Sequence, residues 1–152
     1  MPQSVTITGT RSTDHRPLGD YGTLFEEYLG PFALSGVRFY IGGASGIDSL
    51  SLLWLAHETE VGLTVVVPAM LVDQPGDARH AVASASELGR LDAVVELGGE
   101  TRTPGYHARN RWMVDRSEFV IGFPRAGTEQ SGTLYTLGYG ADQGKPHLVV
   151  PV

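Results

Sequence analysis

The chain has 152 residues, 41% of them hydrophobic and 18% charged, which is the composition of a globular protein rather than of a disordered one. Its formal net charge of -6 argues against a surface that attracts nucleic acid or an anionic membrane, because both attractions depend on clustered lysine and arginine. It contains no cysteine and no apolar run long enough to span a bilayer, so we expect a cytoplasmic protein with one domain, residues 1–152.

Short β-branched stretches alternate with longer amphipathic ones along the chain. The short stretches predict strands over residues 4–8, 37–41, 63–67, 93–97, 119–123 and 147–151. The longer ones predict helices over 18–34, 47–59, 76–88, 106–116 and 132–143. This alternation predicts an α/β protein with a Rossmann-like three-layer open sheet, mostly parallel, of about six strands with helices on both faces.

Three local features refine these elements. Gly30 and Pro31 are expected to end or kink the first helix. The stretch 98–108 has the composition of a loop. In the second helix one face is predicted to be core, and it carries Ile47, Leu50, Leu53, Trp54 and His57.

Two glycine turns lead into predicted helices, GGASGID over 42–48 and GTEQSGT over 127–133. A helix N-terminus presents unpaired amides and a partial positive charge, so each turn is a candidate phosphate site at the carboxyl edge of the sheet. Arg109 and Asn110, at the start of the fourth helix, and Arg11 are the candidate polar and cationic partners. The predicted ligand-binding residues are Gly9, Thr10, Arg11, Gly42, Gly43, Ser45, Gly46, Asp48, Arg109, Asn110, Gln130, Ser131, Gly132 and Thr133. Capping a helix is an alternative role for Asp48.

Other chemistries find little support. The histidines lack metal-ligand spacing, so no metal site is predicted. The dinucleotide fingerprint is missing after the first strand, which reads GTRSTD, and no cofactor is predicted. The stretch GASGI over 43–47 matches a nucleophile elbow only loosely.

Four stretches together resemble the SLOG superfamily, which includes DprA (Smf), the LOG phosphoribohydrolases and the YspA-like nucleotide-binding proteins. They are TITGTRS, GGASGIDSLSLLWLA, ARNRWMVDRSEFVIGFP and SGTLYTLGYGADQGKPHLVVPV, in the order of the family. The sequence is most similar to the DprA and YspA-like branches. This resemblance implies that the SGT turn binds a phosphate. The LOG hallmark is broken, because Thr136 stands where that branch has a glutamate.

These observations lead to a main function and two alternatives. The main expectation is binding or sensing of a nucleotide or a nucleotide-derived phosphate. The first alternative is an N-glycosidase, phosphoribohydrolase or deoxyribosyl transferase, for which Asp48 or Glu129 would supply the carboxylate. The second is DprA-like binding of single-stranded DNA. As partners we expect a small nucleotide rather than nucleic acid, no membrane, and a homodimer or higher homo-oligomer, the last implied by relatives.

Overall fold

The computed structural model describes residues 1–152 and contains one six-stranded sheet. The strands lie in the order β4-β3-β2-β1-β5-β6, and every neighbouring pair is parallel. Their bounds are β1 (Ser4–Gly9), β2 (Arg38–Gly42), β3 (Gly62–Val67), β4 (Ala93–Glu96), β5 (Phe119–Phe123) and β6 (His147–Val149). The predicted α/β class is confirmed, and the sheet is wholly parallel.

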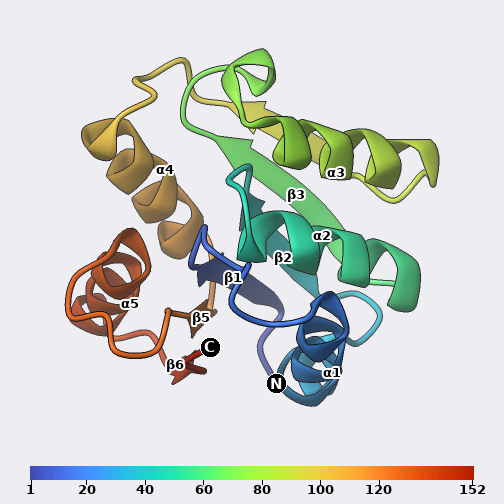
Figure 1. Ribbon diagram of the computed structural model, residues 1–152, viewed down its shortest axis with the longest axis horizontal. Helices are drawn as coiled ribbons and strands as arrows, with labels where there is room; N and C mark the ends of the chain where they lie inside the picture. The colour runs from blue at the N-terminus through green and yellow to red at the C-terminus, as the bar shows by residue number, and fades with distance from the viewer.

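Helices cover both faces of this sheet (Figure 1). Their bounds are α1 (Leu18–Tyr28), α2 (Ile47–Glu58), α3 (Gly76–Glu87), α4 (Thr103–Asp115) and α5 (Gly132–Asp142), with short 3-10 turns η1 (Gly30–Phe32) and η2 (Leu71–Asp73). Alternate strand residues point to opposite faces: Ile41 belongs to the core shared with α1 to α3, whereas Tyr40 packs with Met113 of α4. No helix combines the length and hydrophobicity that crossing a bilayer requires.

Three element boundaries differ from the predictions by more than one residue. The first helix ends at Tyr28 instead of 34, just before the glycine and proline of η1, which were expected to end or kink it. The fourth helix begins at Thr103 instead of 106, because Pro104 fits the first turn of a helix, where its missing amide hydrogen costs nothing. The loop predicted over 98–108 therefore ends at residue 102. The last strand stops at Val149.

The predicted core face of α2 is wrong in part. Ile47 is fully buried, but Leu50, Leu53 and Trp54 are only half-buried and His57 is exposed. The helix contacts α1 on one side and α3 on the other, within the same layer. Because each neighbouring helix buries part of α2, its buried apolar residues are not confined to the predicted face. They include Leu52, Leu55 and Ala56.

The strand order reverses beside β1, and this reversal positions the functional site. From β1 the chain moves outward through β2 and β3 to β4, then returns through α4 to β5 on the other side of β1. Val5 of β1 consequently pairs with Phe39 of β2 and with Phe119 of β5. In parallel sheets the loops diverge at such a reversal and leave a crevice outside the carboxyl ends of the strands.

Candidate functional site

A polar pocket of about 380 Å³ lies at the carboxyl end of β1. Its walls come from the segment after β1, the turn before α2, and the first turns of α4 and α5. Nine of the predicted binding residues line it, namely Gly9, Thr10, Arg11, Asp48, Arg109, Asn110, Ser131, Gly132 and Thr133. The structure thus gathers residues from four separate parts of the sequence around one hollow of the size that small ligands occupy.

The first turn of α5 offers unpaired backbone donors to this pocket. The Oγ of Ser131 caps the helix by accepting a hydrogen bond of 3.1 Å from the amide of Leu134. The amides of Gly132 and Thr133 donate to no acceptor within the protein, and both residues line the pocket. Free amides at the positive end of a helix dipole form a site for a negatively charged oxygen.

Arg109 supplies a buried positive charge to the same pocket. Its Nε donates to Oδ1 of Asn110 at 2.6 Å, and its Nη1 donates to the carbonyl of Val66 at 3.4 Å. Burial lowers the pKa of this guanidinium, and the nearby Asp48 opposes that effect. An arginine keeps its charge across the physiological range, and Nη2 has no acceptor in the protein. Arg109 is therefore oriented by its neighbours and retains donors for a ligand.

Asp48 places a carboxyl group beside this arginine. Burial raises the pKa of Asp48 to about 7, although Arg109, the amide of Ala44 and Arg11 all favour its charged form. The amide of Ala44 donates to Oδ2 at 3.3 Å. The only ion pair within 4.0 Å in the protein joins Arg102 to Glu100, so Asp48 and Arg109 interact across a short gap and not by direct contact. With this pKa the carboxyl group is partly protonated near neutral pH.

Aromatic rings form the outer wall of the pocket. The guanidinium carbon of Arg11 lies 4.2 Å from the centre of the Tyr106 ring. The His107 ring stacks on Tyr135 at 3.6 Å with an angle of 9° between the rings. Burial and the charge of Arg111 lower the pKa of His107, so the ring is neutral at pH 7. These flat surfaces suit the stacking of a nucleobase or a sugar.

Two amides of the glycine turn at 42–46 are used within the protein. The amide of Gly46 donates to Asp77 at 3.4 Å and that of Ala44 to Asp48, so neither is free for an external anion. Position 46 requires glycine, because its φ is 77° and a Cβ there would lie 2.5 Å from the carbonyl oxygen of Thr10. A Cβ on Gly42 would lie 2.6 Å from Nη1 of Arg109. Gly46 therefore makes room for the backbone after β1, and Gly42 makes room for the side chain of Arg109.

Five predicted binding residues lie outside the pocket, namely Gly42, Gly43, Ser45, Gly46 and Gln130. The carbonyl of Gly43 accepts a hydrogen bond from Gln74, and Ser45 donates to Asp77 at 2.7 Å. Gln130 is exposed on the loop before α5 and does not line the pocket. These side chains and carbonyls are therefore occupied within the fold or face solvent.

Only one of the two candidate catalytic carboxylates reaches the pocket. Asp48 lines it, whereas Glu129 is exposed on the loop before α5 and does not. Thr136, at the position of the LOG glutamate, is fully buried and donates to the carbonyl of Gly132 at 2.8 Å. Of the two candidate carboxylates, only Asp48 is placed to take part in acid–base chemistry in this pocket.

Sequence reasoning missed several lining residues, chiefly Thr103, Tyr106 and His107. Thr103 was missed because the fourth helix was predicted to start at residue 106. Proline at position 104 was the available signal, because it is favoured in the first turn of a helix. Tyr106 lies within the predicted helix, four residues before Asn110 and on the same face, and this spacing was the signal for Tyr106.

The fold and the pocket together define a Rossmann-like α/β protein with a polar pocket at the reversal of its strand order. No protein-family model matches the sequence, and no curated protein matches it. Comparison of folds is more informative, because solved structures match almost the whole chain.

Two of these structures are DNA processing protein A from different bacteria. The protein from Helicobacter pylori, described for its single-stranded DNA binding mode, superposes with a TM-score of 0.70 at 22% identity over 99% of this chain and 66% of its own. The protein from Streptococcus pneumoniae has a TM-score of 0.72 at 19% identity over 98% of this chain and 50% of its own. The chain therefore has a DprA-like fold and spans one half to about two thirds of the neighbours' length.

This result corrects the expectation that nucleic acid is not a partner. The expectation rested on the net charge of -6. A protein with the same fold has a single-stranded DNA binding mode, so the net charge of the chain does not exclude that class of partner. What matters for a phosphate is the local field of the pocket, where Arg11 and Arg109 converge. The resemblance to the LOG and YspA-like branches stays a prediction.

Proposed function

We propose that this protein binds single-stranded DNA and takes one phosphate of the strand into the pocket. The observation that carries the proposal is the convergence of two free amides at the start of α5 with the guanidinium groups of Arg11 and Arg109. These donors match the oxygens of a phosphate, and charge-assisted bonds of this kind are the strongest hydrogen bonds in proteins. The DprA-like fold supports DNA as the source of that phosphate.

The aromatic residues of the pocket favour a nucleotide over inorganic phosphate as its ligand. Tyr106 and His107 line the pocket beside the phosphate donors. Single-strand binding proteins combine cationic groups for the backbone with aromatic rings for the bases. The pocket offers both within one hollow.

Exchange of Arg11 for alanine tests the proposal without disturbing the core, because Arg11 is exposed and forms no hydrogen bond in the protein. A charge-assisted bond contributes about 1.5 to 3 kcal/mol, so we expect Arg11→Ala to weaken binding of a labelled oligothymidylate roughly 10- to 100-fold. Each phosphate contact on a single strand adds about -0.7 to the salt slope, and the slope should become shallower by about that amount.

Arg38→Ala is the matched control. Arg38 is exposed at the start of β2, at the opposite edge of the sheet, and its loss changes the net charge equally. Equal effects of the two substitutions in fluorescence anisotropy would show that only the overall charge matters, and would rule out the pocket as the DNA site.

A free mononucleotide is the second candidate. The pocket volume of about 380 Å³ favours it, since a hollow of this size encloses one small molecule. A thermal-shift series with nucleoside monophosphates, run beside the oligonucleotide, separates the two candidates. Stabilisation by a monophosphate without any binding of the oligonucleotide would select the second.

A further inference from the structure

A second hollow of about 230 Å³ adjoins the pocket. The two share Arg11, Ala44, Tyr106 and Arg109, so they are neighbouring parts of one groove. Beyond these shared residues, the second hollow is lined by the turn before α2, by the segment 73–75 before α3, and by Thr101. It therefore extends the groove toward β3 and α3.

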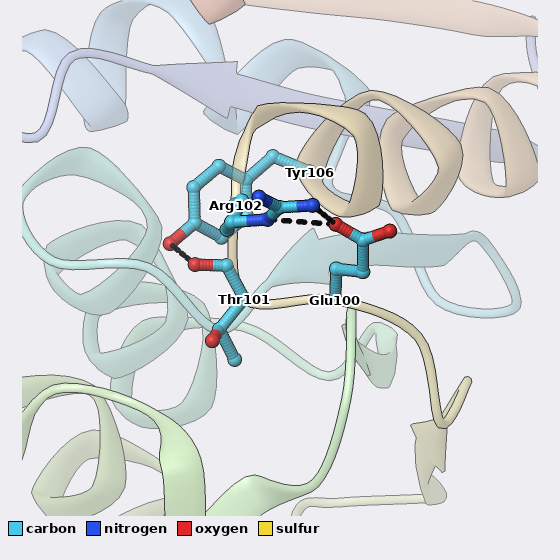
Figure 2. Close-up of polar contacts among 4 residues, drawn as sticks. All are labelled: Glu100, Thr101, Arg102 and Tyr106. Atoms are coloured by element: carbon cyan, nitrogen blue, oxygen red, sulfur yellow. Dashed lines mark hydrogen bonds and ion pairs between the residues drawn. The ribbon is translucent and has the colours of Figure 1, made fainter.

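Arg11 and Tyr106 lie at the boundary between the two hollows. The guanidinium of Arg11 covers the Tyr106 ring at 4.2 Å. The Tyr106 hydroxyl donates to the carbonyl of Thr101 at 2.7 Å, and the neighbouring Arg102 is held by Glu100 (Figure 2). The Tyr106 ring is thus held at its hydroxyl by Thr101 and on one face by the guanidinium of Arg11. Arg11 and Tyr106 together form a wall between the two hollows.

The chemistry of the second hollow differs from that of the pocket. No free helix amides from α5 reach it, and Asp73 adds a carboxylate that partly offsets the charge of the shared Arg11 and Arg109, so this hollow is less suited to a phosphate than the pocket is. Gln74 and Ser45 are bonded within the protein. The hydroxyl of Thr101 has no partner, and Asp73 accepts only one hydrogen bond, from the amide of Met70. Neutral groups with donors, such as a sugar or a base, fit these acceptors better than an anion does.

Building on the proposed function, we infer that the second hollow is a nucleoside subsite for the nucleotide next to the one whose phosphate occupies the pocket. The DNA strand would pass over the wall formed by Arg11 and Tyr106. The guanidinium of Arg11 would contact the DNA backbone, and the Tyr106 ring would contact a base. A ligand of two linked nucleotides then gains contacts that a mononucleotide cannot make. The affinity of the site would therefore depend on the length of the ligand.

Two phenylalanine substitutions, two residues apart, separate the hollows. Thr101 lines only the second hollow and Thr103 only the pocket, and both residues are exposed. Thr101→Phe fills the subsite and Thr103→Phe fills the pocket. The bond from Tyr106 uses the backbone carbonyl of Thr101, so the first substitution keeps it. Circular dichroism and thermal melting check that both variants fold.

The assay is competition of thymidine 5′-phosphate and its 5′-phosphorylated di- and trinucleotides against a labelled oligothymidylate. In the unchanged protein we expect roughly tenfold tighter binding on going from one nucleotide to two, the scale of one stacked base. Thr101→Phe should abolish this gain and leave the mononucleotide unaffected. Thr103→Phe should weaken all three ligands.

The outcomes distinguish this inference from the proposed function. If the second nucleotide adds nothing, or if Thr101→Phe keeps the full gain, the subsite is refuted while phosphate binding in the pocket stands. If Thr103→Phe leaves every ligand unaffected, the pocket is not the binding site and both proposals fail.

Discussion

Replacing Asp48 with asparagine should make the stability of the protein less dependent on pH. The carboxyl group has an ordinary pKa of 3.8 and a pKa of about 7 in the fold, because burial disfavours its charge. Between these values the unfolded chain has lost the proton and the folded chain keeps it. Folding therefore takes up a proton, and the free energy of unfolding falls as the pH rises through this window.

The magnitude follows from the size of the shift. One pKa unit corresponds to about 1.36 kcal/mol, so the full penalty above pH 7 is about 4 kcal/mol. Asparagine cannot ionise, yet its carbonyl can still accept the hydrogen bond from the amide of Ala44. Between about pH 5 and about pH 8, the stability of Asp48→Asn should rise relative to the unchanged protein by about 2 to 3 kcal/mol.

Urea unfolding at several pH values measures this difference directly. For a chain of this size it corresponds to about 5 to 10 °C in melting temperature. Asp92→Asn, which removes one exposed carboxylate, controls for the loss of a negative charge. A difference between Asp48→Asn and the unchanged protein that stays constant with pH would refute the assignment of a raised pKa to this group.

Three further predictions concern binding and packing. Affinity for the oligothymidylate should fall between about pH 6.5 and about pH 8.5, as ionisation of Asp48 cancels part of the pocket's positive charge, and Asp48→Asn should flatten this profile in anisotropy. Ser131→Ala removes the helix cap and should lower the free energy of unfolding, measured in urea, by about 1 kcal/mol. Ser131→Asp keeps a cap but adds a negative charge, so it should retain stability in urea and lose affinity for the oligothymidylate in anisotropy. Equal affinity of Ser131→Asp and the unchanged protein would contradict this prediction. Gly9→Ala should destabilise the protein by about 1 to 3 kcal/mol in urea unfolding, because its Cβ would lie 2.3 Å from the Ile47 side chain. Gly19→Ala is the control and should not destabilise the protein, because a Cβ there would have nothing within 4 Å. Equal effects of the two substitutions would contradict the packing argument.

Much of the fold could be predicted from the sequence. The four central strands are largely buried in the parallel sheet, so they appear as apolar runs such as LTVVV, bounded by turn residues. The start of α4 was missed because glycine and proline in RTPGYHA suggest a loop, and only the position of the proline marks the helix.

The candidate site could be predicted only in part. The SGT turn and Arg109 follow from local signals, because a serine before a helix and an arginine in its first turns have a limited set of roles. The GGASG turn could not be interpreted from its own residues. Two of its amides donate to Asp48 and to Asp77, and Asp77 lies on a different helix further along the chain. Whether a glycine turn binds a ligand or its own protein depends on such tertiary contacts.

The central position of β1 has a consequence for how the molecule folds. This strand pairs on one side with β2, which follows it closely in the sequence, and on the other with β5, which lies far along the sequence. Closing so long a loop is slow, because its entropy is lost before the contacts form. The walls of the pocket come from segments on both sides of this separation, so the pocket cannot form until α5 has been synthesised.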